Sequence, residues 1–357
     1  MAPDAPRNTN RRTAMPDLSL ISAAALFAVS AFAVWQAGAR LAYLADALAD
    51  RFHLGKSIVG LVALSTATSL PEIATTLSAA VKQSQDLVLN NLFGGVALQT
   101  AILAMADFWA RGAITNYPRS ANHALEAALL NLMLGLTIVL LVIGGRWSFG
   151  WIGLGSVVIA LVYAGAIWLL RRYDRQGGWV PVDLPDFEPG EGPVPGDLHR
   201  LPSWRLLSRA SAFCALILVF GVGLVISAEA IATQSGLGAS FVGVTFLAAA
   251  TSLPELTTSI AAVRIGAYTL AISNIFGSNL IMIVLVFPAD LLYTRGPILH
   301  APTPILFASL GFGILVTSIF LIGLIVRRKP RLGKVGLDSV LVLGAFVASL
   351  AVYFALR

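Results

Sequence analysis

Two identical pentapeptides place a carboxylate and a proline inside long apolar runs. "TSLPE" occurs at 68–72 and at 251–255, so the second copy follows 183 positions after the first (255 minus 72). Proline has no backbone N–H, and its ring clashes with the carbonyl group four residues earlier. Each proline therefore breaks its helix and frees one carbonyl oxygen. Pro71 frees the carbonyl of Ala67, and Pro254 frees that of Ala250.

The side chains beside each freed carbonyl are also oxygen donors. Thr68 and Ser69 lie four and three residues before Glu72, so helical spacing brings their hydroxyl groups near its carboxylate. The same donors recur in the second copy as Thr251, Ser252 and Glu255. Hard cations such as Ca²⁺ and Na⁺ prefer oxygen ligands, and the motif holds no His or Cys that favours zinc or copper. The pattern predicts a cation site with a charge of −2.

The composition indicates the class of fold that must position these residues. Apolar residues make up 57% of the 357-residue chain and charged residues 12%, and apolar runs long enough to cross a bilayer recur from end to end. We predict an all-α polytopic membrane protein with about ten transmembrane helices. The predicted crossings lie near 18–48, 57–81, 86–109, 122–143, 149–170, 206–233, 240–263, 267–293, 302–326 and 336–356.

The two halves of the chain are related by duplication. Residues on both sides of "TSLPE" repeat at the offset of 183, without a gap, from Val59 and Val242 to Gly94 and Gly277. The expected organisation is a polar tail (1–17), a first half (18–170), a linker (171–205) and a second half (206–357). Five crossings in each half make the second copy enter the membrane upside down. Inverted repeats are typical of secondary transporters, which bind their substrate where the repeats meet.

Two asparagines are expected at the same depth as the glutamates. A basic residue marks the turn halfway between Glu72 and Asn91, and another marks the turn halfway between Glu255 and Asn274. Ten helical residues from a turn span about 15 Å, which is half of a hydrocarbon core roughly 30 Å thick. All four side chains are therefore predicted near the membrane midplane, where a carboxylate is a functional-site hypothesis by default.

Lysine and arginine residues favour one orientation. Most of those outside the apolar runs fall on the same side as the linker if the N-terminus faces out, including the cluster at 327–334. Because cytoplasmic loops carry an excess of positive residues, we expect the N-terminus outside and the linker in the cytoplasm. The chain shows no sign of a cofactor, a nucleic-acid partner or enzymatic activity. The bilayer is its expected surroundings, and the oligomeric state stays open.

The duplicated segments resemble those of the calcium/cation antiporter superfamily, specifically the prokaryotic sodium/calcium exchanger type. Its repeats resemble "TSLPE" followed about nineteen residues later by "N-x-x-G-S-N"; here these segments read "NLFGGV" (91–96) and "NIFGSN" (274–279). The resemblance implies alternating-access exchange of sodium and calcium across a prokaryotic inner membrane. It also implies that Glu72 and Glu255 are the central ligands, with oxygens from Thr68, Ser69, Thr251 and Ser252, and that Asn91 and Asn274 complete the cage.

Alternatives stay open beside this interpretation. Gly95 and Val96 stand where the family usually has serine and asparagine, which leaves room for a proton-coupled exchanger that uses the same glutamates. Burial favours the protonated form of a carboxyl group. A membrane-embedded enzyme or receptor is a remote alternative, since no nucleophile–base pair accompanies the motif. Gly94, Gly95 and Gly277 are predicted to be close-packing positions rather than ligands, and the four histidines are predicted to form no ligand pattern.

Overall fold

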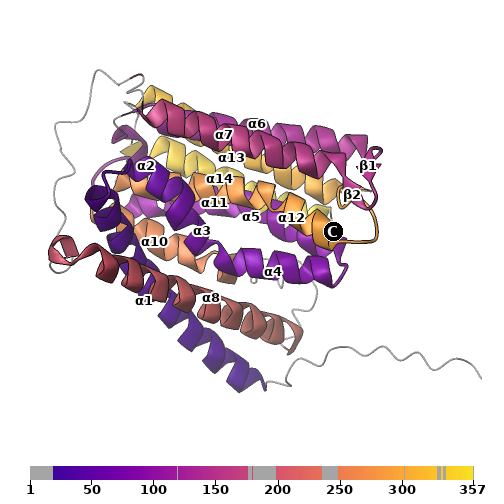
Figure 1. Cartoon of the computed structure of the whole chain (residues 1–357), viewed down its shortest axis with the longest axis horizontal. Coiled ribbons are helices and arrows are strands. Elements are labelled where there is room, and N and C mark those ends of the chain that lie inside the picture. Colours follow the sequence, from indigo (N-terminus) through magenta and orange to yellow (C-terminus); the bar gives the residue numbers. More distant parts are fainter. Residues whose placement is uncertain are drawn as a thin grey trace, which may run out of the picture.

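The computed structural model describes residues 19–118, 120–175, 179, 198–234, 248–300, 302–327, 331–332 and 335–356 as a helical bundle (Figure 1). Eight of the described helices are long and apolar enough to cross a membrane. They are α1 (Leu20–Arg51), α5 (Gln85–Ala106), α6 (Asn122–Ile143), α7 (Leu154–Arg175), α8 (Ser203–Gln234), α11 (Tyr268–Val284), α13 (Pro304–Val326) and α14 (Leu337–Ala355). A short helix, α12 (Val286–Leu292), continues α11.

A bent helix pair adds a ninth span. It comprises α2 (Lys56–Ile58), the π-helical segment η1 (Val59–Leu64), α3 (Ser65–Thr68) and α4 (Leu70–Val81), with a bend of 54° before α4. Its counterpart in the second half is α10 (Leu253–Arg264). The start of the predicted crossing at 240–263, the polar tail and most of the linker lie outside the described residues. The remaining described helical elements are the 3₁₀ turns η2 (Asp107–Trp109), η3 (Ile114–Asn116) and η4 (Leu198–Arg200).

The duplication extends over the whole bundle. Helix α8 begins and ends 183 residues after α1, α10 does so relative to α4, and the starts of α11 and α14 follow those of α5 and α7 by the same step. The packing repeats as well: α4 lies against α8 as α10 lies against α1, and α5 contacts α13 as α11 contacts α6. The prediction of two inverted five-helix repeats is confirmed, and a single gap-free register covers far more than the segment around "TSLPE".

The middle of the bundle is built on α5 and α11. In the apolar stretch of α11 89% of residues are buried, and in that of α5 72% are, whereas the figure is 22% for α1, α7, α8 and α14. The two buried helices contact each other and the bent span, and the outer helices cover them (Figure 1). Because α5 and α11 are mostly surrounded by protein, most of their polar side chains point into the interior rather than into lipid.

Two small hairpins also follow the repeat. Strands β1 (Ser148–Phe149) and β2 (Ile152–Gly153) pair antiparallel between α6 and α7, and β3 (Arg331–Leu332) and β4 (Val335–Gly336) pair in the same way between α13 and α14. Each strand in the second hairpin lies 183 residues after its partner in the first. The inverted repeats place the two hairpins at opposite ends of the bundle.

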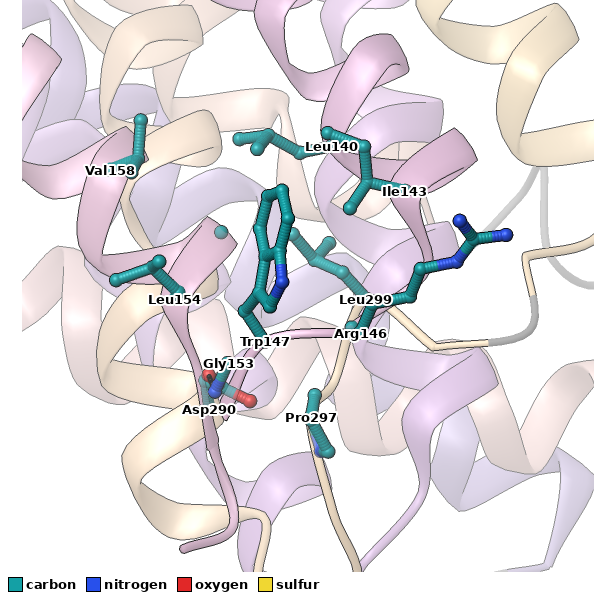
Figure 2. Close-up of a pocket in the computed structure, with 12 residues that line it drawn as sticks. Leu140, Ile143, Arg146, Trp147, Gly153, Leu154, Val158, Asp290, Pro297 and Leu299 are labelled. Carbon is teal, nitrogen blue, oxygen red and sulfur yellow. Dashed lines mark hydrogen bonds between the residues drawn. The ribbon is translucent and has the colours of Figure 1, made fainter. Parts of the chain in front are cut away.

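Each hairpin is bonded to a buried aspartate of the other half. Asp290, at the end of α12, accepts hydrogen bonds from the N–H of Gly153 (2.7 Å) and the hydroxyl of Ser156 (2.6 Å). At the corresponding place Asp107 accepts one from the N–H of Gly336 (2.9 Å). Figure 2 shows Asp290 beside Gly153, below the indole of Trp147, in a mainly apolar pocket between α6 and α7. These contacts join the repeats, and the pocket contains no residue of "TSLPE".

Candidate cation-binding site

Both "TSLPE" segments break their helices with the same backbone geometry. Ser69 has φ −84° and ψ 9°, and Ser252 has φ −85° and ψ 6°. A twelve-residue helix begins directly after each serine, with its proline in the first turn. Proline is tolerated there because the first N–H groups of a helix have no intrahelical partner. The motif therefore ends one helix and starts another at a matching point in each repeat.

Each break places its glutamate in the first turn of the new helix. Glu72 begins α4 and Glu255 begins α10, where free N–H groups and the helix dipole favour negative charge. Their side chains are 2% and 0% exposed. Within the described part of the chain neither carboxylate lies in a salt bridge. Because a buried charge without a partner is costly, the pair requires a bound cation or protons for neutralisation.

The two carboxylates lie close together but have different neighbours. They are near enough for their charges to interact. One oxygen of Glu255 accepts hydrogen bonds from the hydroxyls of Ser69 (2.9 Å) and Ser278 (3.4 Å). The other oxygen of Glu255 and both oxygens of Glu72 have no hydrogen-bond partner among the described residues. Three buried carboxylate oxygens are thus available to a ligand.

The threonines of the motif cross between the repeats. The hydroxyl of Thr251 lies near the carboxylate of Glu72, and the hydroxyl of Thr68 lies near that of Glu255. Both hydroxyls also donate to backbone carbonyls of their own helix segments, Thr68 to Ser65 at 3.2 Å and Thr251 to Ala248 at 3.1 Å. Each glutamate therefore has neighbours from the broken segment of the other repeat, and Ser252, Ala67 and Ala250 of these segments are buried.

The two asparagines occupy matching positions with unequal contacts. Asn274 is fully buried; its amide donates to Thr258 (3.2 Å), and its oxygen accepts from Thr68 (3.4 Å), which belongs to the other repeat. Asn91 is half-buried and donates to Thr76 at 2.8 Å. The structure brings Asn274 to the crossing point, and the described contacts of Asn91 stay within its own repeat.

Sequence reasoning missed two buried amides. Gln99 is fully buried, and neither polar atom of its side chain has a partner in the described residues. Asn279 is also buried; it donates to Thr100 (3.2 Å), and its own oxygen has no hydrogen-bond partner among the described residues. The offset of 183 pairs Gln99 with Met282, so the comparison of the two halves gave no polar match at this position. A lone amide four residues after Gly95 in an apolar helix was the available signal.

Glycines allow close contact between the repeats where η1 meets α11. A Cβ on Gly277 would collide with the Leu61 carbonyl and approach the Ser65 hydroxyl at 2.7 Å, and a Cβ on Gly60 would lie 2.8 Å from the carbonyl of Leu270. The prediction of close packing is confirmed for Gly277. It is wrong for Gly95, where a Cβ would meet Met282 at an ordinary 3.5 Å. Gly94 has no described neighbour near such an atom. The π-helical segment η1 lies against α11 at the Gly277 contact.

The family described as "Sodium/calcium exchanger protein" matches residues 22–171 and 210–355, the two halves of the bundle. This chain belongs to the sodium/calcium exchanger family. It is therefore an integral, multi-pass membrane transporter and a cation antiporter rather than an enzyme, as the sequence predicted. The resemblance recognised in the duplicated segments is confirmed by this match.

Individual relatives cover most of the chain. It is 28% identical over 343 residues to "Inner membrane protein YrbG" of Escherichia coli, with 94% of this chain and 98% of that protein aligned. It is 26% identical over 265 residues to "Putative antiporter CaxA" of Alkalimonas amylolytica, covering 74% and 78%. A structure of the sodium-calcium exchanger NCX_Mj shares its fold, with a TM-score of 0.67, 18% identity, and coverage of 93% and 99%.

Proposed function

We propose that this antiporter exchanges sodium for calcium at a single site between Glu72 and Glu255. The observation that carries the proposal is the pair of buried carboxylates at two symmetry-related helix breaks, with three oxygens unpaired among the described residues. Their combined charge of −2 is neutralised by one Ca²⁺ or by two Na⁺ ions. Calcium takes six to eight oxygen ligands, so further donors must come from the surrounding segments.

The neighbouring groups supply those donors. The hydroxyls of the motif stand beside the carboxylates, and the carbonyl groups before each proline are the backbone donors. Asn274, which reaches across the repeats, contributes an amide oxygen, and the side-chain oxygen of Gln99 has no hydrogen-bond partner among the described residues. The proposed ligand set is Glu72, Glu255, Thr68, Thr251, Ser69, Ser252, Asn91, Asn274, Gln99 and the carbonyls of Ala67 and Ala250.

The inverted repeats suit alternating access. Two copies that enter the membrane in opposite directions allow the same site to face either side when they exchange conformations. We place the protein in a prokaryotic inner membrane with its N-terminus outside and its linker in the cytoplasm. The Escherichia coli relative is named an inner membrane protein, which supports this location. The distribution of lysine and arginine supports this orientation.

A proton-coupled exchanger is the second candidate, and one observation favours it. Glu72 lacks the hydroxyl contact that Glu255 receives from Ser278, because the matching residue is Gly95. A buried carboxylate without hydrogen-bond donors takes up a proton more readily than one that is stabilised by them. In this version Glu72 alternates between calcium and a proton at the same site.

Transport into inside-out vesicles separates these candidates. Vesicles are loaded with sodium and diluted into sodium-free buffer that contains radioactive calcium. Sodium-driven exchange predicts calcium uptake that depends on the outward sodium gradient and is lost when the gradient is dissipated. Uptake that ignores sodium but follows an imposed pH gradient would establish the proton version. If neither gradient drives calcium uptake in vesicles that contain the correctly folded protein, the proposed function is wrong.

A further inference from the structure

A second buried polar cluster lies outside the candidate site. It comprises His123 and Glu126 at the start of α6, Ser57 in α2 and Ser273 in α11, all between 0% and 5% exposed. One oxygen of Glu126 accepts hydrogen bonds from Ser57 (2.6 Å) and Ser273 (2.7 Å). The other oxygen of Glu126 is bonded to Nδ1 of His123 at 2.9 Å. A single carboxylate thus connects three helices that are distant in sequence.

The two serines lie on the bent span and on α11, close to residues of the candidate site. Ser57 lies in the first turn of the bent span, which continues through η1 and α3 to Thr68, Ser69 and the break. Ser273 directly precedes Asn274, whose side chain reaches Thr68. Between these points a Cβ on Gly60 would lie 2.9 Å from the Cβ of Ser273, so η1 and α11 are already in close contact. The position of Ser57 relative to Ser273 therefore sets where the broken segment meets α11.

Among the described residues, the matching place in the other repeat lacks this cluster. The offset of 183 pairs His123 with Leu306, Glu126 with Ser309 and Ser273 with Asn90. Ser309 is bonded within its own helix, to the carbonyl of Ile305 at 2.8 Å. A buried carboxylate costs free energy unless hydrogen bonds replace its hydration. The second half of the chain has no carboxylate at the matching position, which is Ser309. Within the described residues the cluster therefore occurs at only one end of the bundle.

We propose that Glu126, oriented by His123, is a positioning residue for ion exchange: it fixes the first turn of the bent span to α11 through Ser57 and Ser273. This inference rests on the proposed function for its transport readout. In the described part of the chain, no hydrogen bond or ion pair joins Glu126 or His123 to the glutamates of the site. Glu126 therefore acts on the rate at which the broken segment takes up its working positions, and leaves the affinity for the ion nearly unchanged.

The test compares Glu126→Ala with Glu126→Gln and with Ser309→Ala, the matched control from the other repeat. Hydrogen bonds to a charged group contribute more free energy than those between neutral groups. We therefore expect the maximal exchange rate of Glu126→Ala to fall about tenfold, with KM for calcium within about threefold of wild type. Glu126→Gln keeps an acceptor oxygen for both serines and should restore the rate to within about threefold. Ser309→Ala should exchange ions at the wild-type rate.

Several results would overturn the inference. Wild-type rates in Glu126→Ala, or a changed KM with an unchanged rate, would contradict a positioning role. Equal loss in Glu126→Ala and Glu126→Gln would assign the effect to the charge instead. If Glu126→Ala fails to fold, the double variant Ser57→Ala with Ser273→Ala removes the same contacts without emptying the space, and full activity in that variant would refute the proposal.

A second measurement separates this inference from the function itself. Hydrogen exchange of the amides in α2, η1 and α3 should be faster in Glu126→Ala than in wild type and unchanged in Ser309→Ala, whichever ion is transported. Absence of calcium exchange in the wild type would count against the proposed function alone. Unchanged hydrogen exchange in these segments would count against the positioning role alone.

Discussion

The two halves of the candidate site share a backbone but not an environment. The breaks at Ser69 and Ser252 differ by only a few degrees in φ and ψ, and the helices that follow have equal length. Around them, Glu255 receives hydrogen bonds from two hydroxyls, whereas Glu72 receives none among the described residues. The contacts of the asparagines differ in the same direction, since only Asn274 is described as bonded across the repeats.

This comparison shows which features of the two repeats have stayed alike and which have diverged. The break is preserved because both halves need a proline, a freed carbonyl and a carboxylate at the same depth to build one site. The residues on α5 and α11 that face the break are not so constrained, because one cation can take its ligands unequally from two sides. We infer that Glu255 is the anchored carboxylate and that Glu72 is the one that responds to the bound ion.

The largest expected effect comes from neutralising either carboxylate. Glu72→Gln and Glu255→Gln should each reduce calcium exchange by at least about a hundredfold, because a divalent cation then faces half the charge in a buried site. Radioactive calcium uptake in vesicles measures this. Glu229→Gln, at an exposed position on α8, is the matched control and should transport normally. Substantial exchange in both site variants would remove these residues from the site.

Substitution of a close-packed glycine should mainly affect stability. In Gly277→Ala the new methyl group collides with the carbonyl of Leu61, so we expect a loss of about 1–3 kcal/mol in the free energy of unfolding. Gly94→Ala, at the matching position of α5, places its methyl group where no described atom lies within 4 Å and should be nearly neutral. Thermal unfolding of the purified proteins in detergent compares them. Equal melting temperatures would show that α11 and η1 tolerate separation.

The aspartates that bind the hairpins should behave as an equivalent pair. Asp290→Asn and Asp107→Asn each replace one acceptor oxygen by a donor that faces a backbone N–H, which should cost about 1–2 kcal/mol. Because neither residue belongs to the candidate site, calcium affinity should be unchanged. Melting temperature and equilibrium calcium binding measure the two effects. A change in affinity without a change in stability would contradict this role.

The smallest expected effect tests the asymmetry directly. Gly95→Ser supplies Glu72 with the hydroxyl that Ser278 supplies to Glu255, and should raise the apparent calcium affinity by about threefold. Ser278→Gly, the reciprocal change, should lower it by a similar factor. Calcium titration of each purified variant gives the comparison. Shifts in the same direction for both variants would show that the two carboxylates are not distinguished by these hydroxyls.

Most of the architecture followed from composition and repetition. Long apolar runs predicted the membrane spans, their odd number in each half predicted the inversion, and the repeated "TSLPE" predicted the helix breaks that the structure shows. The full extent of the duplication was hidden because few side chains outside the core of the repeat are shared. The pairing of Asp107 with Gly336, and of Asp290 with Gly153, became visible only when the hairpins were seen at the same offset.

The surroundings of the site were less predictable for a physical reason. Proline and helix spacing are local properties, so they determine the break from five residues. The partners of Glu255 and of Glu126 come from segments far along the chain, and their positions depend on packing between helices. His123 illustrates the limit: its spacing fits no metal-ligand pattern, as predicted, yet the fold gives it a buried carboxylate partner.

Equilibrium calcium binding to the purified protein tests the central claim most directly. If Glu72 and Glu255 form one shared site, equilibrium dialysis with radioactive calcium should detect one bound ion per chain in the wild type and almost none in either Glu72→Gln or Glu255→Gln at the same calcium concentration. Retention of about half the wild-type binding in each single variant, with loss only in the double variant, would show two independent sites and contradict the account.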